Sequence, residues 1–218
     1  MKDRRIAVVT GGTGGIGTAI CRRLHADYQV VACYFKNGGH VEPKQWEEEQ
    51  KAAGFNFDMV FVNVVKYDDC ENLVQTVKDR YNRIDVLVNN AGTTADSTFK
   101  KMTIQQWQKV IDTNLNSIFN VTRNVLPFML EREYGRIINI SSINGRKGQF
   151  GQCNYAATKS ALYGFSKSLA QEVASKGITV NTISPGYTHT AMLSHIKEDI
   201  LNSIIKQIPV GRLGHPDD

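Results

Sequence analysis

The segment Thr10-Gly11-Gly12-Thr13-Gly14-Gly15-Ile16-Gly17 follows a short apolar run at residues 6–9 and leads directly into an amphipathic stretch at 16–26. The apolar run predicts a buried strand, and the amphipathic stretch predicts a helix. Glycines allow a tight turn and let the backbone approach a bound group, while the helix N-terminus favours an anion. Such a turn between a strand and a helix is typical of dinucleotide-binding α/β folds. We prefer this interpretation to a flexible surface loop.

The rest of the chain alternates short Val- and Ile-rich runs with longer amphipathic stretches. Predicted strands lie at residues 30–33, 59–62, 86–88, 136–140 and 179–183, and predicted helices at 42–53, 69–81, 110–130 and 155–175. Continuous apolar strands separated by helices indicate a parallel sheet covered on both faces. We therefore expect a doubly wound, Rossmann-like α/β fold that forms one domain over residues 1–218. Pro127 should lie in the last turn of its helix or kink it.

Composition excludes several classes of protein. The 218 residues are 41% hydrophobic and 22% charged, which is typical of a globular domain rather than a disordered or collagen-like chain. No apolar run approaches the roughly eighteen residues of a membrane span, and residues 1–5 lead into the first apolar run without the long apolar stretch and small-residue cleavage site expected of a signal peptide. The four cysteines show no C-x-x-C spacing, so we expect reduced thiols in a cytoplasmic protein. The histidines show no metal-ligand spacing, and we predict no metal site.

The formal net charge of +5 suits an anionic ligand such as a nucleotide, coenzyme A or an acidic carrier protein. The basic residues are scattered, without an arginine-rich tract or interleaved aromatic motif, which argues against nucleic-acid binding.

Tyr155 and Lys159 are candidates for proton transfer. If Tyr155 lies on a helix, Lys159 lies one turn further along the same face. A nearby ammonium favours the phenolate and lowers the pKa of the phenol. The hydroxyl of Ser142 could hold the carbonyl oxygen that receives the proton. These residues could form a general acid for ketone reduction, although an exposed Tyr with an unrelated Lys would show the same spacing.

The end of the second predicted strand bears on the choice between NAD and NADP. An acidic residue there pairs with the ribose hydroxyls of NAD, but the first carboxylate here is Glu42. Lys36, His40 and Lys44 are close in sequence and could accept a 2′-phosphate. We predict NADP(H), without choosing which basic residue contacts the phosphate.

With these motifs in order, the chain resembles the classical branch of the short-chain dehydrogenase/reductase family. The resemblance covers the whole chain. It rests on the glycine loop, Asn89-Asn90-Ala91-Gly92, Asn114, Ser142, the Tyr155/Lys159 pair and Pro185-Gly186.

The resemblance implies a role for each matching residue. Tyr155 would be the general acid, Lys159 would lower its pKa and hold the nicotinamide ribose, and Ser142 would hold the substrate oxygen. Asn114 would anchor a water that links Lys159 to solvent. Asn63-Val64 stands where many members have Asp-Val beneath the adenine, and the amide oxygen of Asn63 could bond the adenine amino group. The implied cofactor site comprises Gly11, Thr13, Gly14, Gly15, Ile16, Gly17, Asn63, Val64, Asn90, Ala91, Gly92, Tyr155, Lys159, Pro185, Gly186 and Thr190.

Residues 144–152 also resemble bacterial acetoacetyl-CoA reductases, which supply (R)-3-hydroxybutyryl-CoA for polyhydroxyalkanoate synthesis. The alternatives are a 3-oxoacyl-carrier-protein reductase and a non-catalytic NADP-binding subunit. Gln149 and Gln152 could bond an acyl thioester, Phe150 and Tyr187 could form the wall of an acyl pocket, and Asp96 could face the same cleft. For each, packing of a loop is the alternative.

The chain ends at Pro216-Asp217-Asp218, which resembles the opening of a helix. Family members continue for about one helix and one strand, which completes the sheet and commonly supports a tetramer. We therefore expect a C-terminally truncated domain without the last strand, and a homotetramer if the C-terminus were complete.

Overall fold

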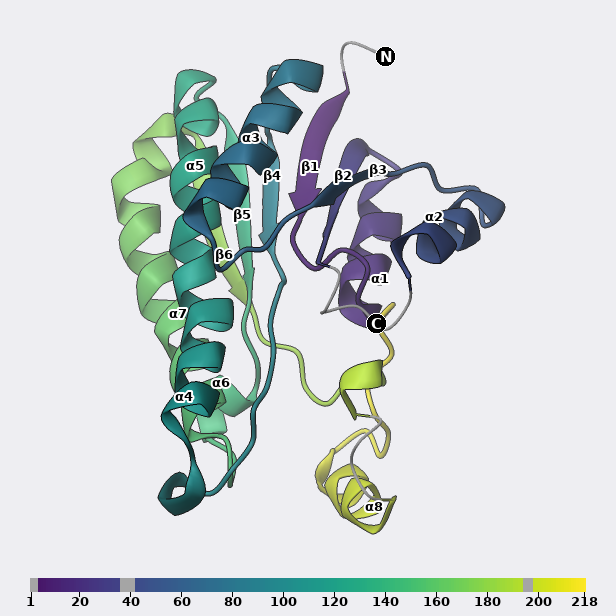
Figure 1. Ribbon diagram of the computed structural model, residues 1–218, viewed down its shortest axis with the longest axis vertical. Coiled ribbons are helices and arrows are strands. Elements are labelled where there is room, and N and C mark those ends of the chain that lie inside the picture. Colours follow the sequence, from purple (N-terminus) through teal and green to yellow (C-terminus); the bar gives the residue numbers. More distant parts are fainter. Residues whose placement is uncertain (1–3, 36–41, 194–197) are drawn as a thin grey trace.

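The computed structural model describes residues 4–35, 42–193 and 198–218 (Figure 1). A six-stranded sheet in the order β3-β2-β1-β4-β5-β6 forms its centre, and every strand pair is parallel. The strands are β1 Arg5–Val9, β2 Tyr28–Tyr34, β3 Asp58–Phe61, β4 Val86–Asn89, β5 Gly135–Ile140 and β6 Ile178–Ile183. This order reverses direction between β1 and β4, so the predicted doubly wound sheet is confirmed.

Helices cover both faces of the sheet (Figure 1). The α-helices are α1 Gly15–Leu24, α2 Pro43–Ala52, α3 Tyr67–Tyr81, α4 Ile104–Ile111, α5 Ser117–Glu131, α6 Asn144–Lys147, α7 Cys153–Val173 and α8 Glu198–Gln207. Along β1, Ile6 and Val8 pack with α3, α5 and α7, whereas Ala7 and Val9 pack with α1 and α2. Side chains alternate between the faces of a strand, so an uninterrupted apolar run is what a sheet covered on both sides requires.

The helix predicted at 110–130 begins earlier and is interrupted. Thr103 caps α4 with a capping box: its hydroxyl accepts from the N–H of Gln106, whose side chain accepts from the N–H of Thr103. A π-helical turn, Asp112–Asn116, then separates α4 from α5. Such turns insert a residue into the helical ladder and often occur at functional sites. Pro127 lies inside α5, one turn before its end.

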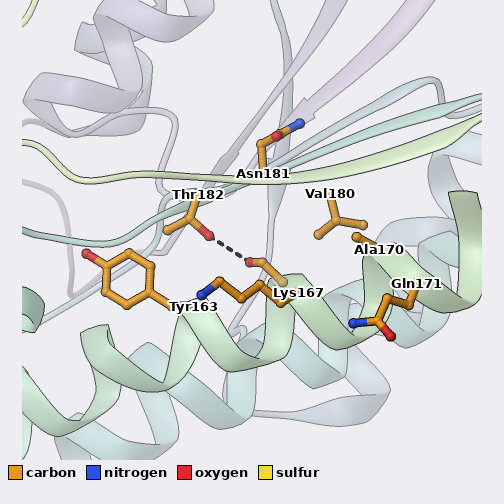
Figure 2. Close-up of a pocket in the computed structure, with 8 residues that line it drawn as sticks. Tyr163, Lys167, Ala170, Gln171, Val180, Asn181 and Thr182 are labelled. Atoms are coloured by element: carbon orange, nitrogen blue, oxygen red, sulfur yellow. Dashed lines mark hydrogen bonds between the residues drawn. The ribbon is translucent and has the colours of Figure 1, made fainter.

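A row of polar side chains fixes the register of the strands below the site. Asn89 of β4 is opposite Asn139 of β5, which is opposite Thr182 of β6. The Asn89 amide donates to Asn139, and Asn139 donates to the hydroxyl of Ser166 on α7, both over 2.9 Å. Thr182 donates to the same hydroxyl at the groove between α7 and β6 (Figure 2). Each of these buried groups has its hydrogen-bond partner in this register, so the row holds α7 against the sheet.

Within the ranges given above, no helix combines the length and apolar character needed to cross a bilayer.

Candidate active site at the carboxyl ends of the strands

The candidate residues gather at one edge of the sheet, because the carboxyl ends of parallel strands meet there. Thr10 follows β1, Asn90 follows β4, Ser142 follows β5 and Pro185 follows β6. The first turns of α7 bring Tyr155 to the same edge.

The hydroxyls of Ser142 and Tyr155 lie near each other, so Ser142 affects the titration of the phenol. Burial raises the pKa of the Tyr155 phenol, the neighbouring Ser142 hydroxyl lowers it, and the nearby carboxylate of Asp96 raises it further. The net direction is upward. Loss of hydration dominates, and Ser142 is the neighbour that opposes it, while the expected lowering of this pKa by Lys159 stays a prediction.

Lys159 is 4% exposed, and its Nζ donates a 2.7 Å hydrogen bond to the carbonyl oxygen of Ile140. Burial lowers the pKa of this ammonium to about 8. The Nζ atom lies 5.7 Å from the centroid of the Tyr155 ring. The predicted pair is thus on one helical face, as the four-residue spacing requires.

Asn114 lies in the π-helical turn and is fully buried. Its Oδ1 accepts from the N–H of Thr93 over 2.8 Å, and its Nδ2 donates to the carbonyl of Thr93 over 2.9 Å. A Cβ on Gly92 would lie 3.4 Å from Asn114 Oδ1 and 3.6 Å from Lys159 Nζ, so these three residues converge. The side chain holds the strand-end loop, and its predicted role with a water stays a prediction.

The glycine loop needs its glycines for close contacts. Gly11 has a φ of 62°, in the left-handed region, and a Cβ on Gly17 would collide with the carbonyl oxygen of Gly11. A Cβ on Gly15 would lie 2.7 Å from the methyl of Thr190, which places Thr190 against the loop. Thr13 precedes Gly14, the N-cap residue of α1, and Ile16 lies in the first turn.

Thr10 organises this loop, although sequence analysis did not single it out as a site residue. Its hydroxyl accepts from the N–H of Asn90 over 3.0 Å and from that of Ala91 over 3.1 Å. In return, the amide of Asn90 donates to the carbonyls of Thr10 and Gly11, both over 3.0 Å. Asn90 and Ala91 therefore brace the glycine loop from the neighbouring strand.

Asn63 and Val64 lie in the turn after β3, and their predicted contacts with the adenine stay a prediction. The Oδ1 of Asn63 accepts from the N–H of Val65 in a local turn over 3.2 Å, so this oxygen already has a donor. Val64 is 8% exposed and belongs to the hydrophobic core, and its carbonyl accepts from Asn120. In this turn, local hydrogen bonding and core packing determine the directions of the two side chains.

The predicted substrate residues form two contacts and leave one side chain in solvent. Gln152 donates to Asp96 over 2.7 Å, and Tyr187 donates to Gln149 over 3.0 Å. Phe150 is 86% exposed, so the expected apolar wall with Tyr187 is not formed. It lies in a turn between Gly148 and Gly151, both of which have positive φ.

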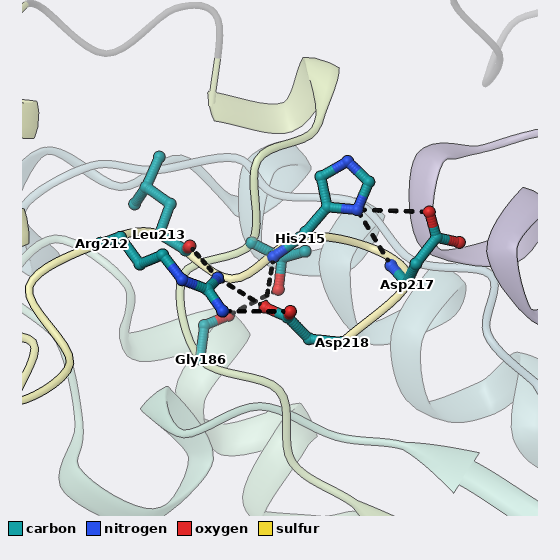
Figure 3. A network of polar contacts seen from close by, with 7 residues as sticks. Gly186, Arg212, Leu213, His215, Asp217 and Asp218 are labelled. Atoms are coloured by element: carbon teal, nitrogen blue, oxygen red, sulfur yellow. Dashed lines mark hydrogen bonds and ion pairs between the residues drawn. The ribbon is translucent and has the colours of Figure 1, made fainter.

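The loop that carries Tyr187 and Thr190 is held by the segment 212–218. The N–H of Gly214 donates to Tyr187, and the N–H of His189 donates to Gly214, each over 2.8 Å. Arg212 forms an ion pair with Asp218, whose carboxylate also accepts from the N–H of His215 (Figure 3). The expected helix opening at 216–218 is therefore a hydrogen-bonded turn.

The residues predicted beside the nicotinamide and the 2′-phosphate differ in their surroundings. The carbonyl of Pro185 accepts from the N–H of Ile143 over 3.0 Å, while Gly186 is exposed beside it. Lys44 is exposed in the first turn of α2, and Lys36 and His40 lie outside the described residues. In the described part of the chain, no cluster of His, Cys, Asp or Glu could hold a metal ion.

Comparisons with known proteins agree with this arrangement. The profile of the short chain dehydrogenase family matches residues 5–201. The chain belongs to this family. It is 53% identical to an acetoacetyl-CoA reductase of Cupriavidus necator, over 99% of this chain and 87% of that protein. A 3-oxoacyl-(acyl-carrier-protein) reductase of Staphylococcus epidermidis is 39% identical over 97% of this chain and 86% of its own length.

A solved structure of an actinorhodin polyketide ketoreductase variant with NADPH also superposes on this chain. The TM-score is 0.91 at 36% identity, and the match covers 100% of this chain and 87% of the other. The short-chain dehydrogenase fold of the described residues is thus shared with a ketone-reducing enzyme.

Proposed function

We propose that the protein is an NADPH-dependent reductase that converts acetoacetyl-CoA to (R)-3-hydroxybutyryl-CoA, a precursor for polyhydroxyalkanoate synthesis. The observation that carries this proposal is the proximity of the Ser142 hydroxyl to the Tyr155 phenol, beside the buried Lys159. The acetoacetyl-CoA reductase of Cupriavidus necator, similar over nearly the whole chain, supports the choice of substrate.

The glycine loop fits a dinucleotide. In the turn after β1, side chains in place of the glycines would fill the space beside the backbone. No side chain of the described residues caps the start of α1. We propose that Gly14, Gly15 and Ile16 receive the pyrophosphate at this helix N-terminus. Gly92 and Lys159 would receive the nicotinamide ribose, and Thr190, which lies against Gly15, would border the nicotinamide. NADPH in this site would supply the hydride that reduces the ketone.

Tyr155 supplies the proton in the proposed reaction. Because its pKa is raised, the phenol is protonated at neutral pH and can donate to the oxygen that becomes the hydroxyl. Ser142 donates a hydrogen bond to the same oxygen as negative charge develops there. Once Tyr155 has lost its proton, the ammonium of Lys159, 5.7 Å from the ring centroid, stabilises the phenolate. Asn114 would hold the water through which the proton is replaced.

The basic residues near Tyr187 suit the phosphates of coenzyme A. Lys147 Nζ lies 5.3 Å from the Tyr187 ring centroid, and Arg146 lies 5.4 Å from that of Tyr163. Both cations are exposed at the end of α6, beside Gln149. We propose that they bind the nucleotide end of the thioester, with Gln149 and Tyr187 closer to the acyl group.

We further propose that the protein acts in the cytoplasm and assembles as a homotetramer. Phe99 and Ile104 line one hollow with Met102 and Trp107, and 71% and 80% of their surface is exposed. Exposed apolar side chains gathered in one place favour association with another copy. Light scattering of the purified protein measures the assembly.

The test is the initial rate of NADPH oxidation with acetoacetyl-CoA, with NADH in parallel. We expect turnover that prefers NADPH. Turnover of an acyl-carrier-protein thioester but not of the coenzyme A thioester would favour the 3-oxoacyl-carrier-protein reductase. NADPH binding without turnover of either would indicate a non-catalytic subunit.

A further inference from the structure

We infer that Asp96 is a positioning residue that acts on Ser142 through Gln152 and Asn144. The inference rests on the proposed ketone reduction but assigns Asp96 and Gln152 a different part in it from binding the substrate. Asn144 was not among the residues singled out in the sequence.

Three hydrogen bonds link these residues in a chain. Gln152 Nε2 donates to Asp96 Oδ2 over 2.7 Å, and Asn144 Nδ2 donates to Gln152 Oε1 over 3.0 Å. The backbone N–H of Asn144 then donates to Ser142 Oγ over 3.2 Å. The chain therefore runs from the loop after β4, across the start of α7, to the catalytic serine at the end of β5.

The charge of Asp96 sets the direction of the chain. An ionised carboxylate only accepts hydrogen bonds, so Gln152 must turn its NH₂ group toward Asp96. The oxygen of Gln152 then faces Asn144, which must turn its own NH₂ group toward Gln152. Each amide has one orientation because the first acceptor is charged, and charge-assisted hydrogen bonds are the strong ones.

One oxygen of Asn144 has no hydrogen-bond partner as a result of this fixed orientation. Asn144 is 6% exposed, and its Oδ1 is a buried oxygen without a hydrogen-bond partner in the described structure. If both amides were turned over, Gln152 could donate to this oxygen, but its own oxygen would then face the Asp96 carboxylate. The observed orientation leaves Asn144 Oδ1 unpaired, which is costly and rare in folded proteins. The hydrogen bond from Gln152 to Asp96 therefore determines the orientation of both amides, although it leaves Asn144 Oδ1 without a donor.

The consequence for catalysis lies at Ser142. Because the N–H of Asn144 occupies an acceptor position of Ser142 Oγ, the serine proton is directed elsewhere, to Tyr155 or to the ketone oxygen. A Gln152 amide that is free to rotate would release Asn144 and loosen this hydroxyl. Small displacements of such groups lower the rate of the chemical step.

Exchanging the carboxylate and the amide between positions 96 and 152 tests this inference against the alternative, in which each residue contacts the substrate independently. Asp96→Asn removes the charge, and Gln152→Glu places two carboxylates where the 2.7 Å bond was. In the double variant, the amide introduced at position 96 donates to the carboxylate introduced at position 152. That carboxylate still accepts from Asn144, so the orientation of Asn144 is kept. We expect kcat to fall about fivefold for D96N and about fiftyfold for Q152E, with the double variant within about threefold of the wild type.

The KM for NADPH should stay unchanged in all three variants, because the chain acts on the ketone-binding hydroxyl. Gln75→Glu is the matched control, since Gln75 donates to Asp79 in an exposed pair on α3. Its kcat should equal that of the wild type.

Losses in kcat that multiply in the double variant would overturn the inference, because each residue would then act on its own. Recovery of the urea unfolding midpoint without recovery of kcat would also overturn it, since the chain would be structural only. The wild-type rate with acetoacetyl-CoA tests the proposed function separately. If the wild type reduces a different 3-oxoacyl thioester instead, the same four proteins are compared on that substrate.

Discussion

The Nζ atom of Lys159 is hydrogen-bonded to the carbonyl oxygen of Ile140 at 2.7 Å, and this ammonium is almost completely removed from water. Lys159 reaches this carbonyl from α7, while Ile140 is the last residue of β5. The bond therefore joins the helix that carries Tyr155 to the strand that precedes Ser142. It places a positive charge at the site at a cost to folding, because burial of a charge is unfavourable.

The pH dependence of stability should reveal this cost. Burial lowers the pKa of Lys159 from its ordinary value of 10.5 to about 8. Between those two values the unfolded state binds more protons, so the contribution of this group to stability rises with pH. Relative to Lys159→Met, the wild type should gain about 3 kcal/mol of unfolding free energy from pH 7 to pH 10.5.

Urea unfolding of both proteins at several pH values measures this difference. Lys167→Met is the control, because Lys167 is exposed on the same helix and should show a flat difference. A flat difference for Lys159→Met as well would show that its ammonium is not destabilised by burial.

Replacement of Tyr155 by Phe should remove the proton donor and leave the fold intact. General acid catalysis contributes on the order of 10²–10⁴ to the rate, so kcat should fall by at least about a hundredfold. The dissociation constant for NADPH, measured by fluorescence titration, should change by less than about tenfold, as the loss of one neutral hydrogen bond predicts. Tyr67→Phe, at an exposed position, should keep full activity. Substantial turnover by the Tyr155 variant would assign the proton to another group.

The thiols should differ in reactivity. Cys153 is exposed at the start of α7, whereas Cys21, Cys33 and Cys70 are buried. Burial raises the pKa of Cys21 and of Cys70 to about 12, and raises that of Cys33 as well. Because the thiolate is the reactive form, a thiol reagent at pH 8 should modify one cysteine in the folded protein and four after denaturation. Rapid modification of more than one would contradict the burial of the other three.

The three buried thiols should also make the folded protein less stable at alkaline pH. Their pKa values are higher in the folded than in the unfolded state, so the folded state retains protons that the unfolded state loses. The stability is complete below the ordinary thiol pKa of 9.0 and falls as pH rises toward 12. Cys21→Ala should have a shallower decline above pH 9 than the wild type in thermal unfolding, and Cys153→Ala should be unchanged.

The pair Arg212–Asp218 should affect ligand binding more than folding. Both side chains are about half exposed, so the pair itself adds little stability. However, Asp218 also orders His215 beside Gly214, which holds the loop of Tyr187. We expect Arg212→Ala to raise the KM for acetoacetyl-CoA about threefold with little change in kcat, as loss of uniform binding predicts. Lys176→Ala, which breaks the exposed pair with Glu133, should leave KM unchanged.

Local pattern was sufficient for the strands and the glycine loop. The strand predicted at residues 6–9 is β1, and a Cβ on Gly17 in the turn after it would collide with the carbonyl oxygen of Gly11, six residues earlier. Tyr155 and Lys159 were predicted together for the same reason, since i and i+4 always share a helical face. The start of α4 could have been found in the same way, because the capping box of Thr103 and Gln106 is itself a local motif.

The sequence by itself therefore determined which residues form the sheet, the loop and the Tyr–Lys pair, because these depend on backbone sterics and on spacing along the chain. Only the tertiary structure decided what surrounds them. Asp96 and Gln152 are 56 residues apart, and Asn90 reaches Thr10 over 80 residues. The pKa of Tyr155 likewise depends on burial, which is set by packing of α7 against the sheet. Hydrogen bonds and hydration are properties of neighbours in space, and no periodicity in the chain encodes them.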